Sequence, residues 1–343
     1  MRARRRLHGN ASGSLLVMTL WLITILSVLA IAIGRYLSID VRLAKYTLAR
    51  EQAKTLARSG VYLAMQRLMR DATPGEAAYE PYDWLGDEWA NGASPDADDP
   101  GAWVVQLQAD GNGPSRVSGS VTIRLSDEER RLDVNTAPAP VLTALLLRLN
   151  GTPELADALI HYRDPAEEAP VDEPPYYPKN APVRAIEELV AIPGLRAVFP
   201  RLQPLVTAAQ GAVSPQAVNI NTVEPDVLIA LCGDPAIVET LVANRPGREG
   251  VWGTSDDCAA TEMSQAATQL ASVACGFSGD TAPLVSHLSL PTASFTISSS
   301  TFRVQVEARV EPDQVTHRIE AVVRRTGCGS GAPDPCIIEW KDG

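Results

Sequence analysis

Residues 15–33 read LLVMTLWLITILSVLAIAI and contain neither a charged residue nor a proline. These 19 residues are just long enough to cross the hydrocarbon core of a bilayer as a helix. A cleaved signal peptide usually has a shorter apolar run, of about 7–15 residues, and no Ala-x-Ala site follows residue 33. Four arginines within residues 2–6 precede the stretch, which favours a cytoplasmic N-terminus. We therefore predict a single transmembrane helix.

The helical pattern continues past the membrane segment. No proline occurs between Ser14 and Thr73, and one set of residues recurs at alternating spacings of four and three. This set consists of Ala49, Ala53, Leu56, Gly60, Leu63 and Arg67. Such a spacing marks one face of a helix. The sequence thus predicts one helix from Leu15 to Arg70, roughly 84 Å long at 1.5 Å per residue, whose second half packs on a folded domain.

The basic leader ends in a glycine directly before the apolar helix. In this arrangement the chain resembles the type IV pilins and pseudopilins. The resemblance implies that a prepilin peptidase cuts between Gly13 and Ser14 and that the new amine of Ser14 is methylated. Major members of this family carry a glutamate at the fifth mature position, where this chain has Met18. The K-type minor pseudopilins of type II secretion systems lack that glutamate, and the resemblance points to them.

The missing glutamate has a physical meaning. A carboxylate in lipid is costly unless it is paired, and in the family it is thought to pair with the free amine of a neighbouring subunit. With Met18 in that position, this chain has nothing to offer a subunit above it. We therefore predict a place at the tip of the fibre.

Strand patterns lie on both sides of the middle of the chain. Alternation of apolar and polar residues predicts strands at Trp103–Leu107 and Val117–Leu125, and an antiparallel meander at Ala293–Ser299, Thr301–Val310 and Val315–Arg324. Residues 71–100 are rich in Pro, Gly, Asp and Trp and predict an ordered loop held by aromatic side chains.

The middle of the chain contains an internal repeat. Residues 132–146 read LDVNTAPAPVLTALL and residues 218–232 read VNINTVEPDVLIALC, with six of fifteen positions identical. In each copy, Asn-Thr before a proline-containing turn predicts a helix N-cap followed by an amphipathic helix. Between the copies, Pro193-Gly194 predicts a hairpin between two helices, the second running through Val206.

These patterns predict an α+β fold, with a long N-terminal transmembrane and pilin helix packed on an antiparallel sheet. A large α-helical domain of helix-hairpin-helix or SAM-like type is inserted into the sheet, as the resemblance to the K-type pseudopilins also implies. The expected parts are a leader (1–13), a transmembrane helix (14–34), the first part of the pilin-like domain (35–132), the inserted domain with two related subunits (133–285) and the C-terminal strands (286–343).

Several functional classes are disfavoured. The net charge of −11 disfavours binding to nucleic acid, and no HExxH, GxSxG or Walker pattern is present, so we do not expect an enzyme. The Pro-Gly hairpin leaves one alternative, a membrane-anchored helix-hairpin-helix DNA receptor for competence. Such modules grip phosphates through a Gly-x-Gly turn, whereas Leu195 and Arg196 follow Gly194 here and the preceding helix carries Glu187 and Glu188.

Acidic clusters make calcium a possible cofactor, because this ion takes six to eight oxygen ligands. The candidate ligands form three clusters: Asp96, Asp98 and Asp99; Glu167, Glu168, Asp172 and Glu173; and Asp256 with Asp257. A solvated loop is the commoner reading of such clusters, and none has the spacing of an EF-hand. The family resemblance also implies calcium binding.

The five cysteines lie in the last third of the chain, where an exported body would allow disulfides. The flexible loop between Cys328 and Cys336 predicts a bond between them. A second bond is expected between two of Cys232, Cys258 and Cys275, with Cys258–Cys275 as our choice and the remaining thiol free.

The family resemblance implies the cellular setting. It predicts a single-pass protein of the bacterial inner membrane with its body in the periplasm. The expected partners are the I- and J-type minor pseudopilins, the pseudopilus, the inner-membrane assembly platform and the prepilin peptidase. The implied function is to help initiate pseudopilus assembly and the export of folded proteins across the outer membrane.

Overall fold

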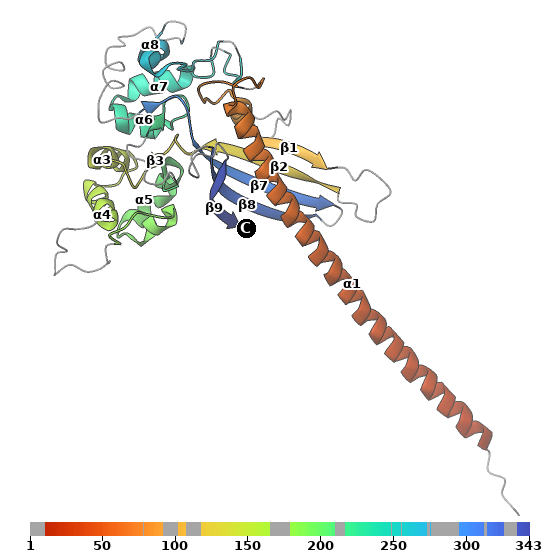
Figure 1. Cartoon of the computed structure of the whole chain (residues 1–343). Coiled ribbons are helices and arrows are strands. Elements are labelled where there is room, and N and C mark those ends of the chain that lie inside the picture. Colours follow the sequence, from red (N-terminus) through yellow and green to blue (C-terminus); the bar gives the residue numbers. More distant parts are fainter. Residues whose placement is uncertain are drawn as a thin grey trace, which may run out of the picture.

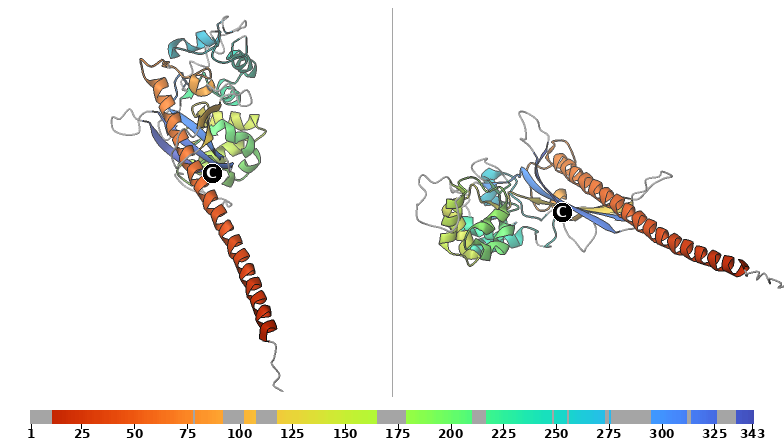
Figure 2. Two further views of the ribbon diagram at one scale, coloured as in Figure 1. Left: turned by 90° about the vertical axis from the view of Figure 1, so that its right-hand side faces the viewer. Right: turned by 90° about the horizontal axis from the view of Figure 1, so that it is seen from below.

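The computed structural model describes residues 11–77, 79–91, 102–107, 118–164, 179–209, 217–247, 249–254, 256–272, 275, 295–311, 314–325 and 335–343. In these ranges a long helix crosses one face of an antiparallel sheet, and a group of short helices lies beside one end of the sheet (Figure 1). The free half of the long helix points away from the short helices, as both views in Figure 2 show. The predicted α+β fold is confirmed.

Helix α1 spans Ala11–Ala72, a little longer than predicted at both ends. Its residues from Leu15 to Leu48 are exposed, and from Ala49 onward one face is buried against the sheet. This face consists mainly of Ala49, Ala53, Ala57, Gly60, Val61, Ala64 and Leu68. The predicted Leu56 and Leu63 lie at its border and are only partly buried. The alanines and the glycine take the centre because small side chains let the helix axis approach the strands closely.

Gly60 marks the closest approach. A β-carbon at this position would lie 2.6 Å from Val306 Cγ1 and 2.8 Å from Val121 Cγ1, closer than real contacts allow. We expect Gly60→Val to lower the free energy of unfolding by about 1–3 kcal/mol, as overpacked cores do. Urea denaturation measures this loss. The control is Ser59→Val, at an exposed neighbouring site; equal stability of the two variants would contradict the close packing.

The sheet has five antiparallel strands in the order β1-β2-β7-β8-β9. The strands are β1 (Ala102–Leu107), β2 (Ser118–Asp127), β7 (Thr301–Glu311), β8 (Val315–Arg324) and β9 (Cys336–Asp342). Alternate residues such as Ile123, Val306 and Ala321 face α1 and form the core of this half. Strand β9 was not among the predicted strands, because it directly follows a stretch rich in glycine and proline.

One predicted strand is not part of this sheet. Of the predicted strand Ala293–Ser299, the structure describes residues 295–299, and among these β6 (Phe295–Thr296) is the strand. It pairs in parallel with β5 (Val218–Asn219). The predicted meander therefore loses its first strand and gains β9 after its last. Two residues are too few for alternation to distinguish the strands of one sheet from those of another.

The short helices lie in sequence between β2 and β7, which are direct neighbours in the sheet. They form a first helical unit (residues 132–207) and a second helical unit (residues 218–296), both named here for their described parts. The first contains β3 (Leu132–Asp133), α3 (Ala139–Arg148), α4 (Pro153–Arg163), η1 (Ile186–Ala191), α5 (Leu195–Leu202), η2 (Gln203–Leu205) and β4 (Val206–Thr207). The second contains β5, α6 (Pro225–Cys232), α7 (Pro235–Asn244), η3 (Met263–Gln265), α8 (Ala266–Leu270) and β6.

The two units repeat one plan. Each begins with a short strand that pairs in parallel with the strand at its end, β3 with β4 and β5 with β6. Together they enclose a core separate from that of the sheet. The boundaries of the predicted inserted domain, 133–285, stay a prediction because residues 276–294 lie outside the described ranges.

The Asn-Thr pairs of the repeat do not cap helices, contrary to expectation. Helices α3 and α6 begin after Pro138 and Glu224, and neither has a side-chain cap. Instead, Asn135 exchanges two hydrogen bonds with the backbone of Val183, at 2.9 and 2.7 Å. At the matching place Asn221 does the same with Ala260, at 3.0 and 2.7 Å. Each asparagine thus connects the repeat, through two hydrogen bonds, to a later segment of the same helical unit.

A buried arginine holds the same turn in each unit. Arg163 donates to the carbonyls of Val134 and Ala137. Arg245 donates to those of Ile220 and Val223, at 2.9 and 2.8 Å. The two pairs of carbonyls are equivalent positions of the repeat. In each unit, the arginine thus supplies hydrogen-bond donors to two backbone carbonyls that would otherwise lack partners.

The Pro-Gly hairpin is present with shorter helices than predicted. Gly194 has a positive φ of 82°, which glycine adopts without strain. The segment before it, η1, is a 3₁₀ helix. The helix after it, α5, ends at Leu202 rather than Val206, because Val206 enters strand β4.

Candidate functional site

Two features of the molecule lie outside ordinary core packing, the free half of α1 and a buried cluster of charges where α1, the sheet and the second helical unit meet. The free half carries no described cover, and its most apolar window has a mean hydropathy of 2.7. In length and composition it fits a single-pass membrane anchor with a folded body on one side.

The processing residues lie in this free half. Gly13 and Ser14 belong to the first turns of α1, and the leader residues 1–10 lie outside the described ranges. Met18 has 70% of its surface exposed, as expected for a side chain that faces lipid or a neighbouring helix. Cleavage at Gly13 and the role of Met18 stay predictions.

The buried cluster is centred on Asp83, in the loop after α1. The Asp83 backbone carbonyl accepts hydrogen bonds from Asn219 and Asn221 of the second helical unit, at 3.1 and 3.3 Å. Its backbone N–H donates to Ile297 O at 2.8 Å, and its carboxylate accepts from Ser299 N at 2.6 Å. One residue therefore connects the loop to the second helical unit and to the segment that leads into β7.

Arg325, just after β8, supplies the positive charge of the cluster. It donates to Asp71 at 2.9 Å and to both carboxylate oxygens of Asp83 at 2.8 and 2.7 Å. It also donates to Ser299 O and lies over the ring of Phe302, 5.1 Å from its centre. Because Asp71 is in the last turns of α1, this arginine ties the long helix to the loop and the sheet.

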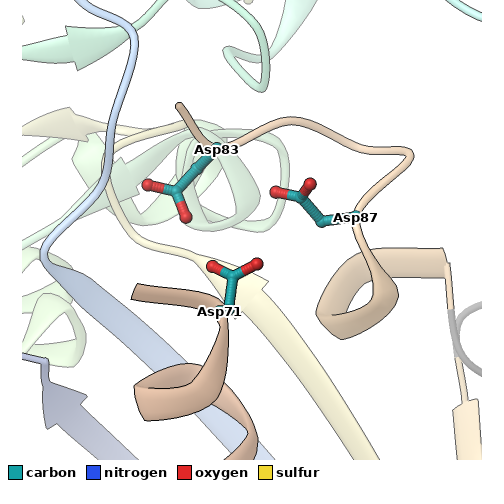
Figure 3. A group of neighbouring side chains, drawn as sticks. All are labelled: Asp71, Asp83 and Asp87. Carbon is teal, nitrogen blue, oxygen red and sulfur yellow. The ribbon is translucent and has the colours of Figure 1, made fainter. Parts of the chain in front are cut away.

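Asp71, Asp83 and Asp87 are all buried, and one carboxylate oxygen from each lies within 4.8 Å of the others (Figure 3). Burial raises the pKa of Asp87 to about 9. Burial, together with the neighbouring Asp83, raises the pKa of Asp71 to about 7. One guanidinium cannot neutralise three carboxylates, so the cluster retains protons near neutral pH.

Among the described residues, these three aspartates are the group best placed to hold a cation. Calcium fits poorly there, however. Arg325 already binds Asp71 and Asp83, and Asp87 accepts from Trp84 N at 2.9 Å and Trp89 Nε1 at 2.8 Å. An ion that needs six to eight oxygens would have to displace the arginine. The ion pairs with Arg325 and the raised pKa values of Asp71 and Asp87 limit the negative charge of the cluster without a metal ion.

The predicted calcium ligands lie elsewhere. Asp257 accepts hydrogen bonds from Gly253 N and Thr254 N, and Asp256 accepts one from the Thr254 hydroxyl at 2.7 Å. These carboxylates close a turn of the second helical unit. Asp96, Asp98 and Asp99 lie outside the described residues. Calcium binding stays a prediction.

A second set of buried acids extends the cluster at the end of β2. Asp127 accepts from the hydroxyls of Thr222 and Ser299. Its neighbour Glu128 pairs with Arg303 at 2.7 Å and with Arg131 at 2.8 Å. The chain passes from strand β2 to the first helical unit at this point. Buried ion pairs and hydrogen bonds therefore also hold the connection between the sheet and the helical units.

The aspartate cluster was not predicted from the sequence. Its only local signal was Asp83-Trp84-Leu85-Gly86-Asp87, which was interpreted as a loop held by aromatic side chains. That interpretation holds in part, since Trp84 packs edge-on against Trp252 and Trp89 against Phe302. Nothing in the spacing indicated that Asp71 and Arg325 join the same site.

The cysteines are distributed as follows. The structure joins Cys258 and Cys275 in a disulfide, with a Cα–Cα distance of 5.5 Å. Cys232 is free and buried, and burial raises the pKa of its thiol to about 12. Cys336 is also disulfide-bonded. Cys328 lies outside the described residues, so the predicted Cys328–Cys336 pair stays a prediction.

Comparison with known proteins bears on the fold. No protein-family model matches the sequence, and no curated protein matches it either. Among solved structures, the chain is similar to the GspK chain in the crystal structure of the GspK-GspI-GspJ complex from the type 2 secretion system of enterotoxigenic Escherichia coli. The match has a TM-score of 0.58 and covers 88% of this chain and 99% of that chain. The fold of this chain is therefore similar to that of the GspK chain.

The sequence identity over this GspK-like match is 18%, so the similarity establishes the fold alone. Nearly the whole of the GspK chain has an equivalent part here, since 99% of it is covered. The K-type resemblance inferred from residues 13–18 and the repeat therefore agrees with the tertiary structure.

Proposed function

We propose that this protein is a minor pseudopilin at the tip of a type II secretion pseudopilus, where it helps initiate assembly and the export of folded proteins across the outer membrane. The GspK-like fold is the observation that carries the proposal. The similar chain was crystallised in a complex with GspI and GspJ, which supports I- and J-type minor pseudopilins as partners here. Such a role is structural and requires no catalysis.

The position of the helical units supports a place at the tip. They lie at the end of the molecule opposite the free half of α1 (Figure 1). In a fibre whose subunits align their long helices, that end points toward the next subunit above. Two units with their own core would occupy the space that this subunit needs. At the tip there is no subunit above, so the helical units clash with nothing.

The tip assignment predicts where labelled protein is found. We expect labelled wild-type protein at one end of isolated pseudopili, as imaged by immunogold electron microscopy. A variant that lacks both helical units, with β2 joined to β7, should enter the fibre along its length if bulk confines the protein to the tip. Met18→Glu should do the same if the missing acid is what excludes a subunit above. Uniform decoration of wild-type fibres would refute the assignment.

The proposal includes the membrane setting. The protein would cross the inner membrane once, with a cytoplasmic N-terminus and a periplasmic body, and would contact the assembly platform there. The apolar free half of α1 and the disulfide between Cys258 and Cys275 support this orientation, because disulfides persist in the periplasm.

Processing provides a second test. We expect a prepilin peptidase to remove residues 1–13 and a methyl group to be added to the amine of Ser14. The basis is the basic leader that ends at Gly13. Intact mass measurement of the protein extracted from membranes would show the shortened, methylated chain. A Gly13→Leu variant serves as the control that should keep its leader, and an intact Met1 in the wild type would contradict the expectation.

A further inference from the structure

The helical units meet the rest of the molecule across a polar joint. Helix α1 and the sheet share one hydrophobic core, and the two helical units share another. The chain passes between these two bodies at residues 128–131 and again at residues 297–300, next to the paired ends of β2 and β7. Two packed bodies that are connected in this way can tilt at the joint without disturbing either core, if polar contacts of the joint break.

On one side of the joint the contacts are ion pairs. Glu128 accepts a hydrogen bond from the Thr207 hydroxyl of the first helical unit, and it pairs with Arg303 at 2.7 Å and with Arg131 at 2.8 Å. Burial acts to raise the pKa of Glu128, but the two arginines outweigh it and the pKa is lowered. This carboxylate therefore stays ionised and paired at neutral and higher pH. We call this the pivot side.

On the other side, uncharged side chains attach the second helical unit to buried acids. Asn219 and Asn221 donate to the backbone carbonyl of Asp83 at 3.1 and 3.3 Å. The Thr222 hydroxyl donates to the carboxyl group of Asp127. Asp83 and Asp127 are each 1% exposed, and these three contacts bring no charge that could neutralise them. We call this the opening side.

The acids of the opening side hold protons. Asp71 is hydrogen-bonded to Asp83 and Glu129 to Asp127, and two carboxyl groups share a hydrogen bond only when one of them is protonated. Burial and Asp83 raise the pKa of Asp71 to about 7, and burial and Asp127 raise the pKa of Glu129. Burial also raises the pKa of Asp87, which lies beside Asp71 and Asp83 (Figure 3), to about 9. A rise in pH through neutrality therefore places like charges in contact.

The titratable and charged groups that face these acids come from each element packed against them. They are Arg67 and Asp71 of α1, Glu80, Tyr82, Asp83 and Asp87 of the loop, Asp127 and Glu129 at the end of β2, and Arg325 after β8. Arg67 is already paired with Glu88 at 2.7 Å. Within this described group, Arg325 is therefore left as the counter-charge of several acids.

We propose that the joint is a proton-controlled hinge, which opens between Asp83 and the second helical unit when its buried acids lose protons, while the ion pairs at Glu128 stay closed as the pivot. The helical units tilt together, because their shared core is not disturbed. The pair between Arg130 and Glu224, at 2.8 Å, limits the opening. The angle between the helical units and α1 then depends on pH. This inference does not depend on the proposed function.

Hydrogen exchange of the full-length protein in detergent, read by mass spectrometry, tests the hinge. Peptides of residues 80–91 and 217–224 report on the opening side, because the amide of Asp83 donates to Ile297 O and that of Asn219 to Glu129 O. Each proton that the closed joint holds and the open joint loses makes opening about tenfold easier per pH unit. We therefore expect the protection factors of these peptides to fall at least about tenfold per pH unit between about pH 6 and 8.

Peptides of the two cores and of the pivot side are the internal reference. Helix α6 and strand β7 exchange only when a core unfolds, so at each pH they should stay at least about tenfold better protected than the opening side. The same holds for residues 128–134, where the amide of Val134 donates to Thr207 O at 2.9 Å. Equal protection of the opening side and the cores would mean that the joint breaks only when the whole protein unfolds, and the hinge would be refuted.

Variants of similar shape separate the protons from the packing. Asp71→Asn with Glu129→Gln keeps a donor toward Asp83 and Asp127 but has no proton to lose at these positions. The double variant should show a fall in protection that is at least about tenfold smaller over the same pH range. The control is Glu239→Gln, an exposed acid of α7, which should leave the fall unchanged.

The wild-type profile decides the matter even if the double variant fails to fold. Protection of the opening side that does not change with pH would overturn the proposal, and so would loss of protection at residues 128–134 equal to that at residues 80–91, because no pivot would then remain. A double variant that folds and responds to pH as the wild type does would also overturn it.

Discussion

Replacing Arg325 with methionine is expected to lower the free energy of unfolding by about 3–5 kcal/mol, the range for breaking a buried ion pair from one side. Arg325 is buried and donates to Asp71, to Asp83 and to the Ser299 carbonyl. Methionine fills part of the same volume but leaves the carboxylates without their counter-charge. The loss should also loosen the joint between α1 and the body, because Asp71 belongs to α1.

Urea denaturation of the detergent-solubilised protein, followed by tryptophan fluorescence, measures the effect. Trp84 and Trp89 hydrogen-bond within or beside the cluster and report on it directly. The control is Arg318→Met, which removes an exposed arginine paired with Glu307 on the sheet surface. Such a surface pair contributes about 0–1 kcal/mol. If the two variants lose equal stability, Arg325 does not hold the cluster together.

A second substitution tests the cause of the loss. Adding Asp71→Asn to Arg325→Met removes one of the stranded charges at similar volume. If electrostatics dominates, the double variant should be more stable than Arg325→Met alone, so the two changes would not be additive. Simple addition of the two losses would indicate that the packing of the arginine matters more than its charge.

The stability of the protein is expected to fall as the pH rises from about 5 to 8, with Asp87 as a principal cause. Burial raises the pKa of Asp87 to about 9, whereas an unfolded aspartate titrates near 3.9. Between these values the folded state holds a proton that the unfolded state has lost. Each such proton lowers stability by about 1.4 kcal/mol per pH unit. The stabilisation is complete below the unfolded pKa and is lost as pH rises toward the folded pKa.

Other buried acids of this region also make the stability depend on pH. Burial and the nearby Asp83 raise the pKa of Asp71 to about 7, which adds to the slope over the lower part of the range. Burial raises the pKa of Glu129 as well, with Asp127 adding to it. For Glu128, burial is outweighed by Arg131 and Arg303, and its pKa is lowered. That carboxylate contributes stability that is complete above its unfolded pKa of about 4.3 and is lost as the pH falls toward its lower folded pKa.

Asp87→Asn is the decisive variant. Asparagine keeps an oxygen to accept from Trp84 N and Trp89 Nε1, and it carries no charge at any pH. We expect the variant to gain stability relative to the wild type as the pH rises. It lacks the proton that folded Asp87 retains, so its free energy of unfolding should fall less steeply with pH. Asp226→Asn is a suitable control, since Asp226 lies in an exposed pair with Arg148. An unchanged slope in Asp87→Asn would mean that Asp87 is ionised in the folded protein.

The part of the fold that could be predicted rests on local periodicity. Helix α1 shows the helical period over the turns that pack on the sheet, and β7 and β8 alternate over much of their length because one of their faces meets the helix. The repeat was visible because equivalent residues, such as Asn135 and Asn221, perform the same task in both units. Its interpretation as a pair of helix caps was wrong, since the same residues favour caps and long-range backbone bridges alike.

The sequence by itself determined the apolar anchor, the continuous helix and the alternating strands, because each depends on contacts with one face that repeats along the chain. Only the tertiary structure decided the site that joins them. Arg325 is more than two hundred residues away in the sequence from both Asp71 and Asp83. Each looks like an ordinary surface charge in the sequence. Burial makes them a linked group, and burial is a property of the assembled fold.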